Sequence, residues 1–353
     1  MPTNPVMIPR VPSRAQTPLW QQAWARAIRD PRELLHRLGL DASLLPGAEQ
    51  GHGLFRTRVP ESYLARIRPG DPRDPLLLQI LPRAEETHEQ PGFIPDPVGD
   101  AAAIAVPGLL HKYAGRVLLI ATGACAIHCR YCFRREFPYS GFSAGRDWAP
   151  ALEYIRGHRD IAEVILSGGD PLALPDASLA ELMRQLEQIP HLRRLRIHSR
   201  LPVVLPERVD RGLLSWLGNG RLQQLLVLHV NHPREYSAPA DRALARLRAT
   251  GVTLLNQSVL LAGVNDDVET LCELQESGFA AGVLPYYLHL LDRVRGAAHF
   301  EVTETRAREL HAGLRARLPG YLVPRLVREV PGAAGKVPPD PVAGALDALR
   351  PGS

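Results

Sequence analysis

Short apolar runs alternate with amphipathic stretches along most of the chain beyond about residue 113. The runs are Val117–Ala121, Val164–Leu166, Leu195–Ile197, Leu225–Val230, Val252–Asn256 and Val283–Tyr287. The amphipathic stretches include Ala177–Ile189, Pro206–Leu217, Ala240–Ala249 and Val268–Ser277. Nearly continuous apolar strands that alternate with helices are typical of a parallel sheet covered by helices. The pattern therefore predicts an α/β fold of six β/α units, arranged either as a partial barrel or as an open doubly wound sheet.

Polar residues follow each of the six predicted strands. In chain order they are Cys125, Ser167–Pro171, His198–Arg200, His229 with Asn231, Gln257, and His289 with Asp292. In barrels and open sheets alike, substrates and cofactors bind at the carboxyl ends of parallel strands. We therefore expect these side chains to converge on one face of the sheet.

Residues 1–105 differ from the rest of the chain in their pattern of apolar and polar residues and are predicted to form a mainly helical extension. The spacing of an amphipathic helix is shown by Trp20, Trp24, Ala27 and Ile28. A second helix is predicted over Pro31–Leu38, with Gly39 at its end. The Pro-rich stretch Arg68–Gly99 predicts turns and an extended linker. Residues 106–318 then form the β/α body, whose last helix is predicted over about Thr303–Leu318.

The C-terminal segment, residues 319–353, carries one of two lysines in the chain. Lys112 and Lys336 are the lysines among 42 basic residues, so arginine supplies nearly every positive charge. An arginine cannot lose its proton at working pH, whereas a lysine amine can form a Schiff base. Lys336 lies in the small-residue stretch P-G-A-A-G-K, which lets an amine reach into a site. It is therefore a candidate catalytic residue.

Charge and hydropathy exclude several classes of protein. The net charge is +5, but no block of basic residues interleaved with aromatics is present, so nucleic-acid binding is not expected. No run of 18 apolar residues predicts a membrane span, and the first ten residues lack the apolar core of a secretory signal. Four cysteines clustered three to one do not make a disulfide framework. We therefore expect a cytoplasmic protein.

Cys125, Cys129 and Cys132 have the spacing C-x3-C-x2-C directly after the first predicted strand. Three thiolates cannot fill the shell of four iron atoms in a cubane cluster, so one iron stays open for reaction. The alternative is a structural zinc site, with His128 or Cys272 as the fourth ligand. The chain has no second pair of closely spaced cysteines, which favours an iron–sulfur cluster.

The cysteine spacing, together with S-G-G-D-P at residues 167–171, resembles the radical S-adenosylmethionine superfamily. Within it, the chain resembles the lysine 2,3-aminomutase family from about Phe93 to Pro338. The segments that carry this resemblance include H-K-Y-A-G-R, C-R-Y-C-F-R-R, R-I-H-S-R-L-P, H-V-N-H-P, N-Q-S-V-L-L-A-G-V-N-D and P-G-A-A-G-K. The segment P-Y-Y-L-H-L-L-D-R-V-R-G-A-A-H-F is similar to the branch that makes β-lysine for modification of elongation factor P.

The resemblance implies a partial (β/α)6 radical S-adenosylmethionine barrel and three cofactors. A [4Fe–4S] cluster would be held by Cys125, Cys129 and Cys132. Residues expected to bind S-adenosylmethionine or line the cofactor site are Ser167, Gly168, Gly169, Asp170, His198, Ser199, Arg200, His229, Asn231 and Gln257. Pyridoxal 5′-phosphate would be held by Lys336, with Lys112, Tyr113 and Arg116 near its phosphate. Contacts with the substrate are implied for Arg134, Asp292 and Glu329.

Two of these implied positions differ in residue type from the family pattern. Glu329 stands where the family has an aspartate, and His289 stands where the lysine-fermenting members have a tyrosine. The two acids, Asp292 and Glu329, predict a substrate with a cationic side chain.

The resemblance implies an isomerase that moves the α-amino group of L-lysine to C3. The alternatives are an aminomutase for arginine or ornithine and an iron–sulfur protein without turnover. A zinc-bearing RNA-modification factor is a third interpretation. Expected partners are L-lysine, an external one-electron donor, and elongation factor P with its lysyl ligase, but neither nucleic acid nor membrane. A homo-oligomer is left open.

Overall fold

The computed structural model describes residues 17–139 and 147–339. The absence of an apolar leader was predicted from the first ten residues, and the C-terminal segment was predicted to run to residue 353. The first of these expectations, and the second beyond residue 339, lie outside the described residues. Within the described ranges, no helix combines the length and apolar character that crossing a membrane requires.

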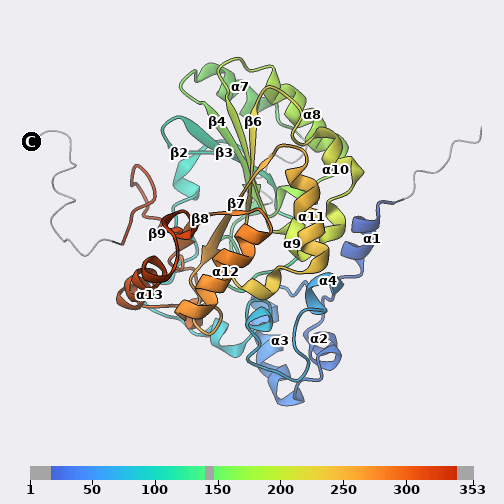
Figure 1. The fold of residues 1–353 in the computed structure, drawn as a ribbon, viewed down its shortest axis with the longest axis vertical. Helices are drawn as coiled ribbons and strands as arrows, with labels where there is room; N and C mark the ends of the chain where they lie inside the picture. Colours follow the sequence, from blue (N-terminus) through green and yellow to red (C-terminus); the bar gives the residue numbers. More distant parts are fainter. Residues whose placement is uncertain (1–16, 140–146, 340–353) are drawn as a thin grey trace, which may run out of the picture.

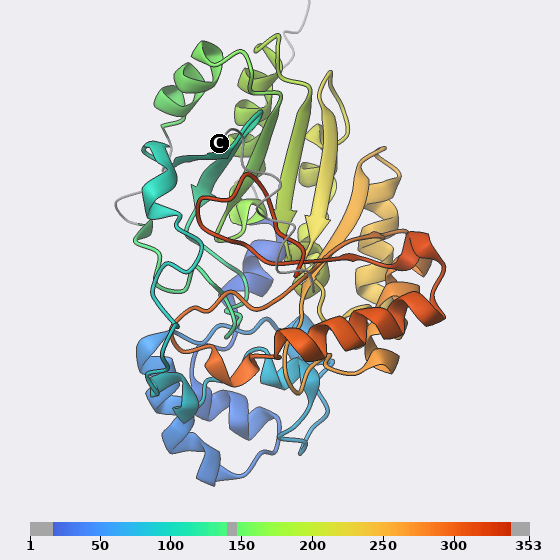
Figure 2. The same ribbon diagram turned by 90° about the vertical axis from the view of Figure 1, so that its left-hand side faces the viewer.

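The described residues form one sheet whose strands follow each other in chain order (Figures 1 and 2). The strands are β1 Ile104–Val106, β2 Leu109–Tyr113, β3 Arg116–Thr122, β4 Glu163–Gly168, β5 Arg194–Ser199, β6 Gln223–Leu228, β7 Thr253–Val259, β8 Leu284–His289 and β9 Arg325–Val327. Strands β3 to β9 are parallel, whereas β1 and β2 join antiparallel at one edge. No pairing between β1 and β9 occurs in the described part of the chain, so the sheet is an open partial barrel.

The six predicted strands correspond to β3 through β8, so the predicted parallel β/α array is confirmed. The short strands at the two edges were not predicted. A two-residue turn joins β2 to β3, where Tyr113 pairs with Arg116 and Gly115 adopts a φ of 74°. At the other edge, β9 pairs with β8 and extends the sheet toward the C-terminal segment.

Helices cover the outer face of this sheet. The helices of the β/α body are α7 Ala149–Gly157, α8 Asp176–Glu187, α9 Leu201–Val204, α10 Arg211–Trp216, α11 Ala238–Arg248, α12 Val268–Ala280 and α13 Glu304–Arg317. Figure 1 shows α8, α10, α11 and α12 along one side of the strands. In β5, Leu195 and Ile197 are buried under this layer, whereas Arg196 and His198 alternate with them and line the inner face. The period of two in a strand thus separates core residues from site residues.

The N-terminal part contains α1 Leu19–Ala25, α2 Pro31–Arg37, α3 Leu45–Leu54, α4 Glu61–Leu64 and α5 Pro75–Leu78. The single helix predicted to reach Ile28 is wrong, because α1 ends at Ala25 and Ile28 pairs with Val59 in a β-bridge. Pro31 begins the next helix, and a proline disfavours helical backbone in the residue before it. The predicted second helix is confirmed as α2, and Gly39 after it has a φ of 61°.

The Pro-rich stretch Arg68–Gly99 is not the extended linker that the sequence predicted. It contains α5, whose Leu76 and Leu77 are 0% exposed. Asp74 caps this helix by accepting from the Leu76 and Leu77 amides at 2.8 and 3.2 Å. An aspartate followed by a proline is a strong helix start, which outweighs the turn-forming composition around it.

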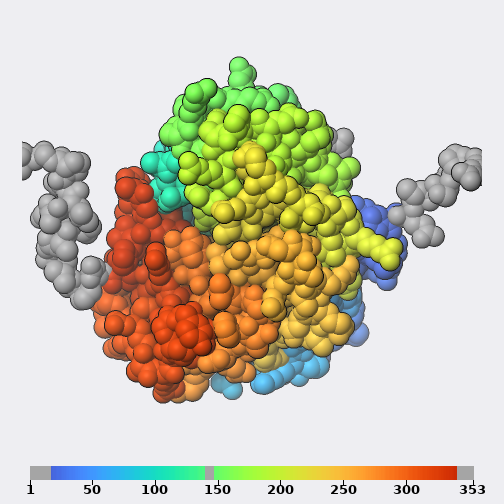
Figure 3. All heavy atoms as spheres, turned by 45° about the horizontal axis from the view of Figure 1, so that its top comes forward, coloured from blue at the N-terminus to red at the C-terminus, as the bar shows by residue number. Residues whose placement is uncertain are grey.

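One apolar core runs through both the N-terminal helices and the sheet. It is continuous from Trp20 of α1 through strand residues such as Leu166 and Leu228. A smaller cluster under α12 and α13 includes Leu271 and Leu310. The space-filling view in Figure 3 shows the green-to-yellow and orange-to-red parts of the chain in direct contact over one face. The division near residue 105 stays a prediction, and the core passes across it without a break.

Candidate active site

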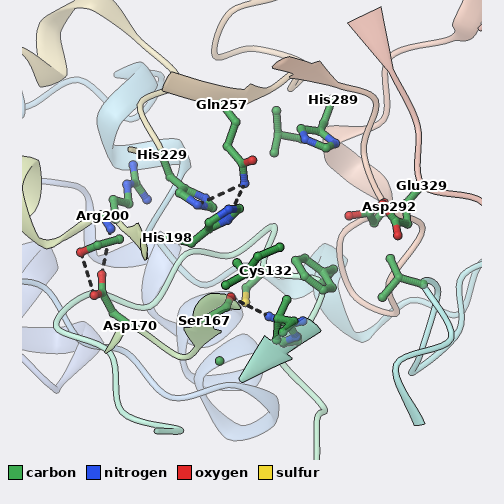
Figure 4. A pocket seen from close by; sticks show the side chains of 18 of the residues that line it. Cys132, Ser167, Asp170, His198, Arg200, His229, Gln257, His289, Asp292 and Glu329 are labelled. Carbon is green, nitrogen blue, oxygen red and sulfur yellow. Dashed lines mark hydrogen bonds between the residues drawn. The ribbon is translucent and has the colours of Figure 1, made fainter. Parts of the chain in front are cut away.

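A cavity with a volume of about 460 Å³ lies at the carboxyl ends of the parallel strands. Its lining includes the predicted residues Lys112, Tyr113, Arg116, Cys125, Cys129, Cys132, Arg134, Ser167, Gly168, Gly169, Asp170, His198, Ser199, Arg200, His229, Gln257, His289, Asp292, Glu329 and Lys336. Figure 4 shows part of this lining. The predicted convergence of polar strand ends is therefore found. Asn231 is different, because it is buried in the wall behind the cavity and donates to Gln79 at 3.1 Å.

The loop that carries the three cysteines is held by the N-terminal region. The Cys125 carbonyl accepts from the Arg58 guanidinium at 3.1 Å, and the Arg130 amide donates to the Gln79 carbonyl at 2.8 Å. The Arg130 guanidinium, fully buried, forms an ion pair with Glu86 at 2.5 Å. These bonds fix the backbone of the loop from outside the cavity, and they leave the cysteine side chains facing into it.

The cysteine sulfurs suit a cluster better than a single ion. His128, a candidate fourth zinc ligand, instead bonds the Arg56 carbonyl through Nδ1 at 2.8 Å, and Cys272 packs on α12 against the smaller core cluster. Among residues 17–139 and 147–339, no three His, Cys, Asp or Glu side chains converge closely enough to hold one metal ion. In a cubane cluster each cysteine binds a different iron atom, so the three sulfurs need not lie as close together as the ligands of a single ion.

Burial outweighs the positive charges that lie near these thiols, such as the guanidinium groups of Arg134 and Arg135 beside Cys132. Burial raises the pKa of Cys132 to about 11, and the neighbouring Cys129 adds to the shift. Iron ions would reverse this effect, because a bound metal favours the thiolate. The three thiols line one cavity and are therefore, by the chemistry of their donor atoms, suited to a metal cluster.

The glycine pair after β4 is required by the fold of the chain itself. A Cβ atom on Gly169 would lie 2.5 Å from the Ala124 carbonyl oxygen, and one on Gly168 would lie 2.5 Å from that of Thr122. Gly168 also has a φ of 117°, which side chains rarely adopt. The pair lets the end of β4 pack directly against the start of the cysteine loop.

Asp170 connects this turn to the end of the next strand. Its carboxylate accepts from the Ser199 hydroxyl at 2.7 Å and from the Arg200 amide at 2.8 Å (Figure 4). It also accepts from the Leu172 amide at 3.1 Å. Asp170 therefore holds the ends of β4 and β5 at a fixed separation.

Two histidines and a glutamine form the inner wall of the cavity. Gln257 contacts His229 at 3.1 Å, and His198 lies beside both (Figure 4). Burial lowers the pKa of His229 to about 3, with Arg200 and Arg134 adding to the shift, and it also lowers that of His198. Both rings are therefore neutral at pH 7.

Several polar atoms of this wall are buried without a hydrogen-bond partner among the described residues. They are Nε2 of His198, Nε2 of His289 and Oε1 of Gln257. Buried polar atoms in folded proteins nearly always have a partner, so unpaired ones that line a cavity indicate a polar ligand. The inner wall therefore has donors and acceptors available to a polar ligand.

Arg134, the predicted carboxylate contact, is anchored at the cavity floor. Its Nε donates to Asp100 at 2.7 Å and one terminal nitrogen donates to Ser167 at 3.0 Å. Lys112 also pairs with Asp100, at 2.6 Å. Asp100 thus orients both cations, and sequence reasoning missed it because it directly follows the Pro-rich stretch and does not stand at the end of a predicted strand.

Lys336 is positioned by the last bridge of the fold. Arg328 and Val337 pair as antiparallel backbone, so the chain turns back toward the cavity with Lys336 at its inner side. The Lys336 amine donates to Glu329 at 2.7 Å, and the Tyr113 hydroxyl donates to the other oxygen of the same carboxylate. Glu329 therefore contacts the lysine of its own chain, whereas the resemblance implied a contact with the substrate.

Asp292 completes this acidic end of the cavity. Burial raises its pKa to about 7, Lys336 opposes the shift, and Glu329 adds to it. Figure 4 shows Asp292 and Glu329 side by side, across the cavity from Cys132. The carboxyl is thus protonated about half the time near neutral pH until a cation approaches it.

Further cationic groups lie near the β2–β3 hairpin. The Arg116 guanidinium lies 4.6 Å from the centre of the Tyr113 ring, and Arg196 bonds Glu163 at 2.7 Å. Arg196, Glu163 and Tyr287 line the cavity but were not predicted. Glu163 begins β4, and Arg196 and Tyr287 lie inside β5 and β8, so none of them follows a strand's carboxyl end, where sequence reasoning looked for site residues.

Comparisons with known proteins were made on the whole chain. No protein-family model matches it. The chain is 49% identical to L-lysine 2,3-aminomutase of Escherichia coli over 91% of its own length and 94% of that protein. It is 45% identical to the Haemophilus influenzae protein of that name, over 94% and 98% of the two lengths. The Clostridium subterminale protein of that name is 37% identical, over 90% and 77%.

Solved structures show a more distant likeness. A radical SAM methyltransferase from Sphaerobacter thermophilus superimposes with a TM-score of 0.44 and 17% identity, over 66% of this chain and 73% of that one. A spore photoproduct lyase variant gives 0.41 and 15%, over 62% and 76%. The sequence relatives are far more similar, and the Escherichia coli and Haemophilus influenzae proteins are matched over nearly their whole length. The chain therefore belongs to the lysine 2,3-aminomutase family of isomerases.

Proposed function

We propose that this protein converts L-lysine to β-lysine by moving its α-amino group to C3. The observation that carries the proposal is that one cavity brings the three cysteines and Lys336 together from opposite ends of the sheet. Curated relatives at 45% and 49% identity are named L-lysine 2,3-aminomutase. The acidic end formed by Asp292 and Glu329 supports a substrate with a cationic side chain.

Three cofactors fit the lining of this cavity. Cys125, Cys129 and Cys132 would hold a [4Fe–4S] cluster, and the inner wall with the glycine turn would hold S-adenosylmethionine. Lys336 would hold pyridoxal phosphate, with the cations Arg116 and Lys112 available to its phosphate. Together these groups supply one-electron hydrogen abstraction and a carbonyl that makes an amino group transferable.

The side chains of the protein would orient lysine between these groups. Arg134 has one terminal nitrogen beyond those bonded to Asp100 and Ser167, which suits a carboxylate. Asp292 would pair with the ammonium at the far end of the substrate. Tyr287 and His289 close the wall between them, and this enclosure excludes water from reactive species.

The experiment is a direct assay of isomerisation. Protein reconstituted without oxygen with iron, sulfide and pyridoxal phosphate is given S-adenosylmethionine, dithionite and each of lysine, arginine, ornithine and glutamate. We expect β-lysine as the main product. Preferred turnover of arginine or ornithine would support the alternative aminomutase. Cleavage of S-adenosylmethionine without amino migration, or no cleavage, would overturn the proposal.

We further propose that β-lysine made by this cytoplasmic enzyme is attached to elongation factor P by a lysyl ligase. The resemblance of residues 285–300 to that branch supports this role. The test is the intact mass of elongation factor P from a host whose own aminomutase gene is deleted, with this chain or its Lys336→Ala variant supplied. A mass unchanged by the active chain would contradict the role. An external one-electron donor completes the set of partners.

A further inference from the structure

One arginine beside the cysteine loop makes a contact that structural support of the loop does not require. Arg200, at the end of β5, directs one terminal nitrogen to the Cys129 sulfur at 2.7 Å. Its other terminal nitrogen donates to Glu235 at 2.7 Å and to Gln79 at 2.6 Å. The guanidinium thus joins a cluster-binding sulfur to a buried carboxylate.

Glu235 is held so that its charge stays beside Arg200. Its side chain is 0% exposed. The oxygen that does not pair with Arg200 accepts from the Asn231 and His232 amides at 3.0 and 3.2 Å and from Gln79 at 3.2 Å. A buried carboxylate with this many donors remains ionised and does not move. Arg200 and Glu235 are therefore a fixed pair with no net charge, and the positive member is on the sulfur side.

Another buried arginine of this region, Arg130, shows the contrast. Arg130 directs its donors to Glu86 and to the carbonyls of Phe55 and Gly51, so all its partners are oxygen atoms. Among the buried arginines of residues 17–139 and 147–339, Arg200 is the one whose side chain donates to a cysteine sulfur. Hydrogen bonds to cluster sulfurs and nearby charge are the means by which proteins set cluster potentials.

We propose that the Arg200–Glu235 pair sets the reduction potential of the cluster proposed for the three cysteines. In the step concerned, an external reductant loses one electron and the cluster core changes from 2+ to 1+, with no proton transferred. The added negative charge is stabilised by the guanidinium at the Cys129 sulfur and opposed by the carboxylate behind it. This inference rests on the proposed function, because it needs the cluster to be present.

The pair offers a set of variants that change the charge beside the cluster in opposite directions. Arg200→Gln leaves the carboxylate and makes the site more negative, and Glu235→Gln leaves the guanidinium and makes it more positive. The double variant carries neither charge. Arg208→Gln is the control, since Arg208 is a fully buried arginine that pairs with Asp176 and lies over the Trp20 ring, away from the cysteines. Arg200→Lys keeps the positive charge but loses the planar guanidinium, whose two terminal nitrogens contact Cys129 and Glu235.

The measurement is the midpoint potential of the reconstituted cluster, followed by electron paramagnetic resonance during a dithionite titration. We expect Arg200→Gln to lower the potential and Glu235→Gln to raise it. Each shift should reach about tenfold in the reduction equilibrium, or about 59 mV for one electron. The double variant should fall between the two, and Arg208→Gln should match the wild type.

Each outcome decides between the inference and the function on which it rests. If the wild-type protein held no reducible cluster, the proposed function would be contradicted. A normal wild-type cluster with equal shifts in both single variants, or with no shift in either, would overturn the inference and leave the function standing. If Arg200→Gln fails to assemble a cluster, Glu235→Gln still gives the sign of the carboxylate's effect, and a lower potential in the double variant than in Glu235→Gln gives that of the guanidinium.

Discussion

The Lys336 amine lies 2.7 Å from Glu329, and the two residues stand on opposite arms of the bridge between Arg328 and Val337. This places the amine inside the cavity with an acid as its partner. The resemblance implied an aspartate at the position of Glu329. A glutamate extends one methylene further than the aspartate of the family pattern, and here that carboxylate meets both Lys336 and the Tyr113 hydroxyl.

Lys336→Ala should abolish covalent binding of pyridoxal phosphate and leave iron binding intact. The amine is the group that can form the carbon–nitrogen double bond, and the cysteines lie at the other end of the cavity. The visible absorbance of the cofactor and the iron content, measured on the same sample, check both halves. Lys336→Arg is the matched control, because it keeps the charge beside Glu329 but cannot bind covalently. Loss of iron in the Ala variant would contradict the placement.

Gly169→Ala should destabilise the protein by about 1–3 kcal/mol, the usual cost of overpacking. Its Cβ would lie 2.5 Å from the Ala124 carbonyl, so the start of the cysteine loop must shift. Gly157→Ala is the control, because nothing lies within 4 Å of the added atom. The free energy of unfolding in urea and the iron content should both be lower for Gly169→Ala than for Gly157→Ala. Equal free energies of unfolding would mean that the glycine turn tolerates a side chain.

Glu86→Gln should weaken both folding and cluster retention. Glu86 is 0% exposed and pairs with Arg130 at 2.5 Å and Arg135 at 2.6 Å, so the change leaves buried guanidinium groups without a counter-charge. Removing one partner of a buried pair costs about 3–5 kcal/mol. The iron content per chain should fall together with the free energy of unfolding, since Arg130 belongs to the cysteine loop.

The control for this variant is Glu61→Gln, which removes an ion pair with Arg37 at the surface. The Glu61 side chain is 45% exposed, and such pairs contribute about 0–1 kcal/mol. Glu61→Gln should therefore retain iron and unfold like the wild type. If Glu86→Gln did the same, the ion pair with Arg130 would not be what holds the loop.

Asp292 should make the cofactor-free protein lose stability as the pH rises from about 4 to about 7. Its pKa is about 7 in the folded protein against an ordinary 3.8, so over this range the folded form keeps a proton that the unfolded form releases. Asp292→Asn lacks this loss. Compared with the wild type, the free energy of unfolding of Asp292→Asn should therefore be about 2 kcal/mol higher at pH 8 than it is at pH 4. This figure takes about 1.4 kcal/mol per pKa unit and is reduced to allow for water in the cavity.

Urea unfolding of both proteins across this range measures the effect. Parallel stability curves would show that the Asp292 carboxyl titrates normally. Substrate binding should have the opposite dependence, because the ammonium of lysine needs the carboxylate. The KM for lysine should therefore rise as the pH falls below 7 in the wild type, and this trend should be absent in Asp292→Asn.

The regular part of the fold could be predicted from the sequence because burial on both faces makes parallel strands nearly continuous apolar runs. β4, with Val164 and Leu166 buried, is a clear case. The edge strands could not be predicted this way. β9 has three residues, and β1 pairs with β2 through an irregular register, so neither has a pattern long enough to detect.

The site followed from the sequence wherever a residue stands at a strand end, as His198 and Gln257 do. Asp100 and Gln79 were missed because their positions depend on how the N-terminal region folds against the sheet. The same limit applies to the pairing of Lys336 with Glu329, since the two are brought together by a single bridge. Local patterns predict which strand a residue follows, but partners across the cavity depend on tertiary packing.

The unbroken core from Trp20 into the strands has a consequence for anyone who wishes to shorten this enzyme. A fragment starting at residue 104 would expose to water the leucines that now contact α5, and it would discard Arg58, Gln79 and Glu86, which brace the cysteine loop. Such a truncation would yield an aggregating polypeptide rather than a minimal catalyst. The N-terminal helices and the strands share one apolar core, and the cysteine loop lies where the two meet.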